Sequence, residues 1–140
     1  MLTFITMRID LGSNSVAIVG SGLVGCLHGL YMKKHGYDVT FFEWREDPRK
    51  VSESGRSINL IITSRGINAL TGLSDALATR IMSITTRVDG RTIHKADGTS
   101  VFQAYGPNSD YCNFSVSRSE LNKLLIAAAE EAGCTFHFAH

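Results

Sequence analysis

The chain has 140 residues and a hydrophobic fraction of 44%, which suits one domain with a packed core and argues against disorder. The formal net charge of +1 gives no reason to expect nucleic acid as a partner. No apolar run approaches the length of a membrane span, so no membrane segment is expected in this chain. Cys26, Cys112 and Cys134 lie far apart and follow no zinc or disulfide pattern, which predicts reduced, mostly buried thiols.

The first elements predict a strand–helix–strand unit. Residues 1–14 are expected to form a disordered leader. The apolar run 16–19 ends in glycines, as a buried parallel strand does. A helix is expected from about Leu23, with Lys33, Lys34 and His35 in its last turn and Gly36 at the cap beyond its C-terminus. A second strand over 38–43 completes the unit.

The glycines between this strand and helix match the G-x-G-x-x-G pattern of dinucleotide-binding folds. Gly20 permits a tight turn, Gly22 lets the backbone approach a pyrophosphate, and Gly25 allows close packing of helix and strand. Glu43 ends the second strand 18 positions after Gly25, where a carboxylate can accept hydrogen bonds from ribose hydroxyls. A 2′-phosphate would face this carboxylate, so NADP is disfavoured as the ligand of this site, while NAD and FAD both stay open.

The middle of the chain predicts short elements of mixed type. After a charged loop, an extended segment is expected over 57–63, followed by helices that begin at Ser64 and Ser74 and end near Leu70 and Met82. From 84 to 105 the pattern changes to two polar strands around the turn signal ADG, which predicts an antiparallel hairpin.

The C-terminal part returns to a parallel α/β pattern. A short strand at 114–116 leads to the capping box of Ser117 and Glu120, which opens a strongly amphipathic helix. A third parallel strand begins after Gly133. His137 and His140 are expected on opposite sides of that strand, where they would make a poor metal pair, and no metal site is predicted.

These elements predict an α/β fold, in which a Rossmann-like strand–helix–strand unit carries an inserted antiparallel hairpin. The sheet is expected to be incomplete at the C-terminus, because the sequence stops as a strand begins and no helix follows to cover it. The chain is therefore interpreted as the front portion of a longer protein.

Several longer stretches carry a more specific resemblance. They are GSGLVG at 20–25, EWRED at 43–47, GRSINL at 55–60, RTIH at 91–94, AYG at 104–106 and SVSRSELN at 115–122. Over about 15–140 the chain resembles the kynurenine 3-monooxygenase family of FAD-dependent aromatic hydroxylases. A NAD-dependent dehydrogenase would explain the glycines and Glu43, but neither GRSINL nor the pair of Arg91 and Tyr105.

The resemblance implies domains and residue roles. It assigns 15–83 and 113–140 to the FAD-binding domain, the second part truncated, and 84–112 to a hairpin of the substrate domain. Arg91 and Tyr105 are implied to bind the carboxylate of the substrate, and no residue of this chain is implied to be catalytic. The implied FAD-binding residues are Gly20, Gly22, Val24, Gly25, Glu43, Arg45, Leu60, Ile61 and Arg118.

The activity implied by the resemblance is hydroxylation of L-kynurenine to 3-hydroxykynurenine, with bound FAD, NADPH as a transient reductant, and O2. This reaction belongs to tryptophan degradation and NAD biosynthesis. The fragment alone is expected to be inactive. Another flavin-dependent aromatic hydroxylase and a truncated, non-catalytic FAD-binding module remain as alternatives. The resemblance implies a cellular location that depends on the organism. A eukaryotic full-length member is expected at the mitochondrial outer membrane, and a bacterial member in the cytoplasm.

Overall fold

The structure is a computed structural model, and it describes residues 14–51, 58–108 and 110–140. The expected leader, except Asn14, and the first three residues of GRSINL lie outside these ranges. The elements in chain order are β1 (Ser15–Val19), α1 (Leu23–Lys34), β2 (Asp38–Glu43), β3 (Asn59–Ile62), α2 (Ser64–Leu73), α3 (Asp75–Met82), β4 (Thr86–Val88), β5 (Gly90–His94), β6 (Ser100–Ala104), β7 (Asn113–Ser117), α4 (Arg118–Glu131) and β8 (Thr135–Phe138).

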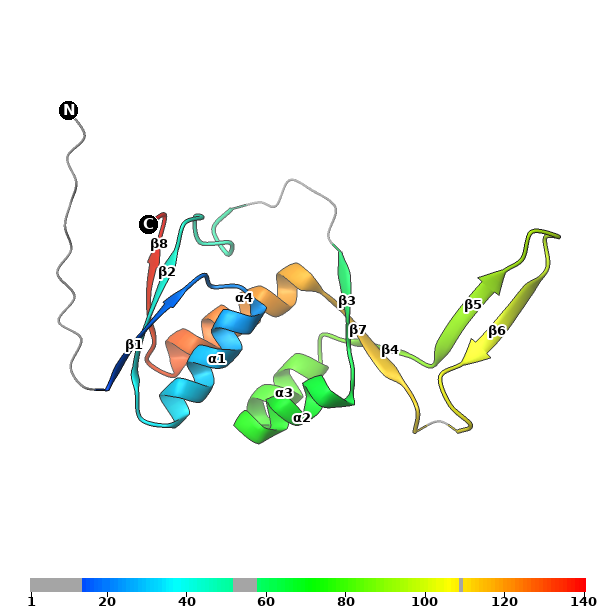
Figure 1. Cartoon of the computed structure of the whole chain (residues 1–140), viewed down its shortest axis with the longest axis horizontal. Helices are drawn as coiled ribbons and strands as arrows, with labels where there is room; N and C mark the ends of the chain where they lie inside the picture. The colour runs from blue at the N-terminus through cyan, green and yellow to red at the C-terminus, as the bar shows by residue number, and fades with distance from the viewer. Residues whose placement is uncertain (1–13, 52–57, 109) are drawn as a thin grey trace, which may run out of the picture.

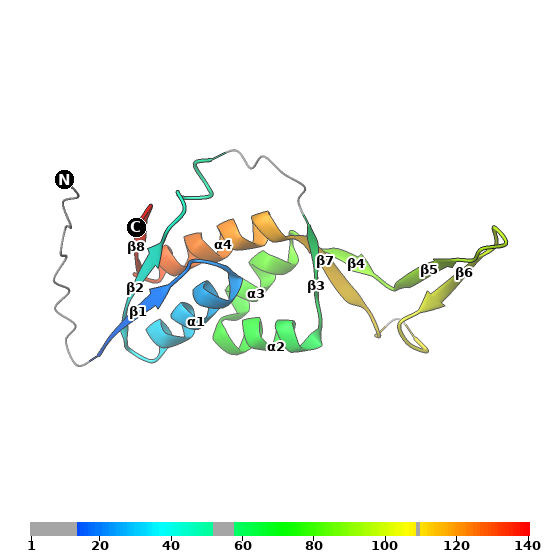
Figure 2. The same cartoon turned by 45° about the horizontal axis from the view of Figure 1, so that its top comes forward.

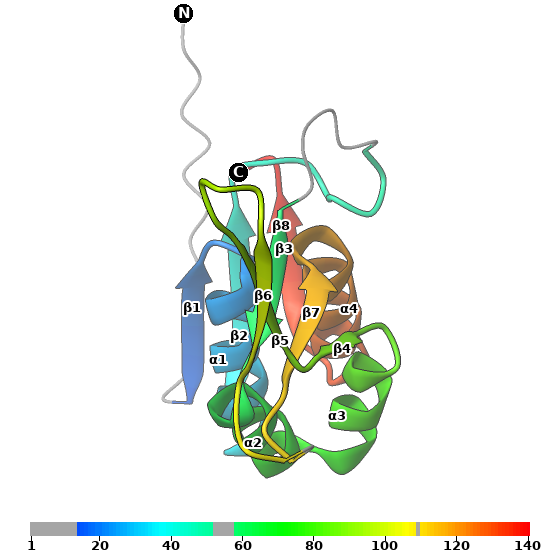
Figure 3. The same cartoon turned by 90° about the vertical axis from the view of Figure 1, so that its right-hand side faces the viewer.

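The first sheet is parallel and has the order β1-β2-β8. This is the strand order 3-2-1 of half a doubly wound fold, and it confirms the predicted strand–helix–strand unit and third parallel strand. Helices α1 and α4 lie side by side on one face of this sheet (Figures 1 and 3). The connection from β1 to β2 and the connection from β2 to β8 therefore cross the same face of the sheet. Right-handed crossovers do this when each new strand is added on the same side of the previous one.

The core forms between this sheet and its helices. Phe41 on β2 is fully buried, and its ring stacks on Phe136 of β8 with centroids 4.3 Å apart. Gly29 of α1 lies against the Phe41 ring, where a Cβ atom would collide with ring carbons. The absence of a side chain at Gly29 therefore sets how closely α1 approaches β2.

The second sheet is antiparallel, with the order β3-β7-β4, and it packs with α2 and α3 into the same core. The hairpin β5–β6 forms a separate ribbon that projects away from the helices (Figures 1 and 2). The hairpin is shorter than the expected 84–105, because residues 86–88 pair with β7 instead. The predicted turn is present, with Gly98 at a φ of +84°.

The helix caps follow the sequence signals with one shift. The Ser74 hydroxyl accepts a hydrogen bond from the Leu77 N–H, and the Ser117 hydroxyl accepts one from the Glu120 N–H, as capping residues do. Helix α2 runs to Leu73, beyond the expected end at Leu70, and its N-cap is Thr63 rather than Ser64.

The prediction that His137 and His140 face opposite sides is wrong. The two rings meet edge to face with centroids 5.6 Å apart. Strand β8 ends at Phe138, and Ala139 adopts a φ of +59°, which turns the chain back over the end of β2. The alternation of a strand therefore stops before His140.

None of the helices in the described part of the chain has the length and apolar character required to cross a membrane.

Substitution of Gly29 by alanine tests the close packing of α1. The added methyl group would overlap the Phe41 ring, so we expect the free energy of unfolding to fall by about 1–3 kcal/mol. Urea denaturation of the purified protein measures this loss. Because Phe41→Leu removes the colliding ring atoms, the double variant should lose less stability than the sum of the two single variants. Simple additivity would show that the collision is not the cause.

Candidate functional site

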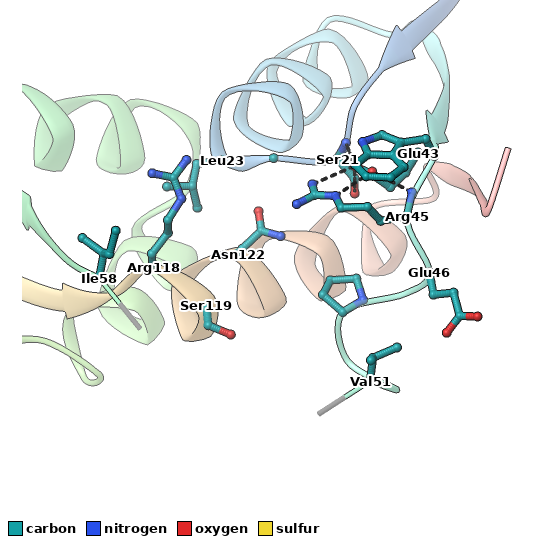
Figure 4. Close-up of a pocket in the computed structure, with 13 residues that line it drawn as sticks. Ser21, Leu23, Glu43, Arg45, Glu46, Val51, Ile58, Arg118, Ser119 and Asn122 are labelled. Carbon is teal, nitrogen blue, oxygen red and sulfur yellow. Dashed lines mark hydrogen bonds and ion pairs between the residues drawn. The ribbon is translucent and has the colours of Figure 1, made fainter. Parts of the chain in front are cut away.

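A cavity of about 660 Å³ lies at the carboxyl end of β2, beside the first turns of α1 and α4 (Figure 4). This is the end of a parallel sheet at which α/β proteins bind their ligands. Four of the predicted cofactor residues line the cavity: Gly22, Glu43, Arg45 and Arg118. The structure thus brings together residues that are almost a hundred positions apart in the sequence.

The glycine turn forms the wall next to α1. Gly20 has a φ of +96°, which favours glycine, and its N–H donates to the Phe42 carbonyl at 2.8 Å, joining the turn to β2. A Cβ on Gly25 would collide with the Gly20 carbonyl, whereas a Cβ on Gly22 would meet nothing within 4 Å. Gly20 and Gly25 therefore shape the turn, and Gly22 keeps its backbone open toward the cavity.

The N-terminus of α1 is suited to an anion. Its N-cap is Gly22, which has no side chain to accept a hydrogen bond from the first turn, and that turn carries no acidic residue. Free N–H groups and the positive end of the helix dipole therefore meet at the cavity. A phosphate group is the ligand that such a terminus stabilises best.

Glu43 is the buried carboxylate at the end of β2, with 1% of its surface exposed. Arg45 binds both carboxylate oxygens, with its Nε 2.9 Å from Oε1, and the Ser21 N–H donates to Oε2 at 2.9 Å. The hydrogen bonds from Arg45, helped by those from Ser21, outweigh burial and lower the pKa of Glu43 from 4.5 to about 2. The group is therefore an ionised acceptor at neutral pH.

Arg118 is the first residue of α4 and is exposed at the other end of the cavity. Its backbone N–H donates to the Ile58 carbonyl, and Figure 4 shows its guanidinium directed toward Leu23. Within the described part of the chain, this guanidinium makes no hydrogen bond or ion pair. A cation at a helix N-terminus is disfavoured by the dipole, and a phosphate held at α1 would compensate for it.

The remaining predicted cofactor residues do not line the cavity. Val24 is 84% exposed on α1, next to the lining residue Leu23. Leu60 and Ile61 lie on β3, paired with β7, and Ile61 is 50% exposed. Their roles in FAD binding stay predictions.

The two predicted substrate residues share one face of the hairpin. Arg91 lies directly opposite Gln103, and its Nε donates to the Gln103 side chain at 2.9 Å. The Tyr105 N–H donates to the Asp89 carbonyl, which continues the pairing, so Tyr105 lies two positions from Gln103 on the same face. The hairpin can therefore present a guanidinium and a phenol together, and their binding of a carboxylate stays a prediction.

Sequence reasoning missed several lining residues, notably Ser21, Trp44 and Asn122. Asn122 follows Arg118 by four positions, so helical spacing alone would place both on one face of α4. Ser21 occupies a variable position of the glycine pattern, and its contact with Glu43 could not be found before the turn and β2 were brought together.

An ion-pair network supports the loop that forms the outer wall of the cavity. Arg49 binds Asp47 in the same loop and reaches Glu130 near the C-terminus of α4. The Arg49 guanidinium carbon also lies 5.9 Å from the ring centroid of Phe138 on β8. The carboxylates and the ring hold the loop that carries Trp44, Arg45, Glu46 and Pro48 against α4 and β8.

Two of the three cysteines are buried thiols. Cys26 is fully buried and its thiol donates to the Ser21 carbonyl at 3.2 Å, while burial raises its pKa to about 12. Cys134 is buried and Cys112 is partly buried, and all three are free. Among the described residues, no three His, Cys, Asp or Glu side chains are grouped so that they could hold a metal ion.

Two relatives illustrate the similarity of the sequence to known proteins. The chain is 44% identical over 126 residues to kynurenine 3-monooxygenase of Cytophaga hutchinsonii, which covers 89% of the chain and 28% of that protein. It is 45% identical over 138 residues to kynurenine 3-monooxygenase of Candida albicans, which covers 96% of the chain and 30% of that protein. The chain thus spans less than a third of the length of these relatives.

Solved structures share the fold at low sequence identity. The tetrameric form of 2-methyl-3-hydroxypyridine-5-carboxylic acid oxygenase matches with a TM-score of 0.71 and 16% identity, over 91% of this chain and 32% of that one. CmlS, a flavin-dependent halogenase, matches with a TM-score of 0.63 and 22% identity, over 93% of this chain and 23% of that one. Because the FAD binding domain family also matches residues 13–140, the chain belongs to that family of FAD binding domains.

Proposed function

We propose that this chain is the N-terminal part of a kynurenine 3-monooxygenase, an FAD-dependent enzyme that hydroxylates L-kynurenine to 3-hydroxykynurenine with NADPH and O2. The observation that carries the proposal is the identity of 44–45% to enzymes of that name across about nine-tenths of the chain. Membership of the FAD binding domain family supports the choice of FAD over NAD.

The residues present fit the cofactor. Gly22 leaves open space where a Cβ would otherwise stand, and the first turn of α1 has no side-chain cap. The Oδ1 atom of Asn122 is buried in the wall and has no hydrogen-bond partner in the described structure. Open backbone, free N–H groups and an unused acceptor in one cavity are the features that a dinucleotide requires.

Three parts of the cavity bind different parts of the cofactor. Glu43 accepts hydrogen bonds from ribose hydroxyls, and its low pKa keeps it ionised. The N-terminus of α1 receives the pyrophosphate, and Arg118 adds a positive charge from the opposite wall. When bound, FAD carries electrons from NADPH to O2 and so supplies the oxygen chemistry that no side chain provides.

The hairpin gives the substrate its orientation. Arg91 and Tyr105 bind the carboxylate of the amino acid, because a guanidinium fork and a phenol hydroxyl can donate to its two oxygens together. The hydrogen bond from Arg91 Nε to Gln103 holds the guanidinium and leaves its outer nitrogens for the substrate.

Turnover by the full-length protein tests the proposal. We expect the purified protein to contain FAD and to consume NADPH and O2 when L-kynurenine is added, with 3-hydroxykynurenine identified by mass spectrometry. FAD without kynurenine turnover, together with hydroxylation of a salicylate-like acid, would identify another aromatic hydroxylase. FAD without any hydroxylation would indicate a binding module.

Glu43→Gln tests the ribose contact. Loss of a charged acceptor should weaken FAD binding about tenfold or more, measured by flavin fluorescence titration of the deflavinated protein. Asp38→Asn, which changes an exposed carboxylate at the other end of β2, is the control and should bind FAD normally.

The pH dependence of the same contact follows from its low pKa. Because the pKa of Glu43 falls on folding, the stability from its pairing is present above 4.5 and is lost as the pH drops through about 2. The Gln variant should therefore abolish that acid-dependent part of the unfolding free energy. If wild type and variant lose stability in parallel between pH 4.5 and 2, the assignment is wrong.

Arg91→Ala tests the substrate contact in the full-length enzyme. Removal of a charge-assisted pair should raise the KM for kynurenine about tenfold to a hundredfold, while the FAD content stays unchanged. Arg87→Ala is the matched control, because Arg87 lies on the neighbouring strand β4 and pairs with Asp89. An unchanged KM for Arg91→Ala would refute the carboxylate contact.

A further inference from the structure

Asn122 is a polar side chain of the cavity wall whose buried amide oxygen has no hydrogen-bond donor among the described residues. It lies in the second turn of α4, four residues after Arg118, and both line the cavity. Figure 4 shows its amide between the side chains of Arg118 and Arg45, directed toward the segment Ser21–Leu23. Its Oδ1 atom is buried and has no hydrogen-bond partner among the described residues.

A buried carbonyl oxygen without a donor destabilises the protein that contains it, because water satisfied that oxygen in the unfolded chain. The other polar groups nearby are already used or directed elsewhere. Glu43 is an ionised carboxylate that only accepts hydrogen bonds, so it cannot donate to Oδ1, and the Arg118 guanidinium makes no hydrogen bond to the amide among the described residues. The described residues offer no donor for Oδ1, and because Asn122 lines the cavity, a molecule bound there is the candidate donor.

The type of atom restricts what that donor can be. Phosphate oxygens on a pyrophosphate only accept hydrogen bonds, so they cannot pair with Oδ1. Within a flavin dinucleotide, hydroxyl groups lie on either side of the pyrophosphate, on the ribose and on the ribityl chain. Asn122 lies between Arg45, at the proposed ribose end of the cavity, and Arg118 at the other end. Both the ribose hydroxyls and the ribityl hydroxyls are therefore candidates for the donor to Oδ1.

We propose that Asn122 is a cofactor-binding residue whose Oδ1 accepts a hydrogen bond from a sugar hydroxyl of the bound dinucleotide. The proposal rests on the proposed FAD function and adds a contact that selects a polyhydroxylated ligand. It makes a specific claim about the protein without cofactor: the amide lowers the stability of that form and contributes binding affinity when the cofactor is present.

Asn122→Leu tests this claim, because leucine has the same branched shape and lacks the polar atoms. We expect the Kd for FAD to rise about five- to tenfold, measured by flavin fluorescence on the deflavinated full-length protein. The melting temperature of the cofactor-free protein should stay equal to wild type or rise, so that the increase produced by FAD becomes smaller. A purely structural asparagine would instead lower the melting temperature of the cofactor-free protein.

Two further variants keep the experiment decisive. Asn122→Ala, which cannot create a collision, should weaken FAD binding in the same way. Asn68→Leu makes the same change on the exposed face of α2, outside the cavity, and should leave FAD binding unaltered. Unchanged FAD affinity in both Asn122 variants would overturn the proposal while leaving FAD binding and turnover by the wild type, and so the proposed function, intact.

Binding of ADP, which contains the adenosine half of FAD without the ribityl chain, shows which hydroxyl donates to Asn122. If Asn122→Leu weakens ADP as much as FAD, the contact is to the ribose of the adenosine half. If ADP binding is unchanged while FAD binding weakens, the contact is to the ribityl chain. Either result supports the contact and identifies its partner.

Discussion

The cavity depends on the buried carboxylate of Glu43. Glu43 stands at the end of β2, accepts hydrogen bonds from the backbone and hydroxyl of Ser21, and pairs with Arg45. These bonds join the glycine turn to the strand beside it, so the N-terminus of α1 and the proposed ribose acceptor have a fixed relative position. The same bonds keep the carboxylate ionised in a buried position, where an unpaired charge would be costly.

The outer wall is held by a different set of charges. Arg49 binds Asp47 in its own loop and Glu130 on α4, and only the first of these contacts is local in sequence. The loop after β2 would otherwise have few apolar contacts, since Trp44 is 78% exposed. The position of Arg45 therefore depends on both ends of its loop: on Glu43 through its own side chain, and on α4 through Arg49.

The sequence was sufficient for the features that arise from local patterns. The strand–helix–strand unit, its glycine turn, the acidic residue at the end of β2 and the cap at Ser117 all follow from spacing within about thirty residues. Contacts that join distant segments could not be predicted in this way. The Arg49–Glu130 pair spans 81 positions, and the buried state of the Asn122 oxygen depends on how α4 lies beside α1. The misplacement of His140 has a local cause, because one residue of positive φ ends the alternation on which the expectation rested.

The second sheet connects the proposed substrate hairpin to the cavity. Strands β4 and β7 pair with each other, so the segments that flank the hairpin are held in one sheet. Strand β7 continues directly into α4, which carries Arg118 and Asn122, and the Arg118 N–H donates to Ile58 just before β3. The residue that leads into β3 and the residues that follow β7 therefore line the cavity together. The hairpin and the cavity are therefore connected through this sheet, because the chain enters β7 at Asn113 after the hairpin and reaches the cavity wall at Arg118.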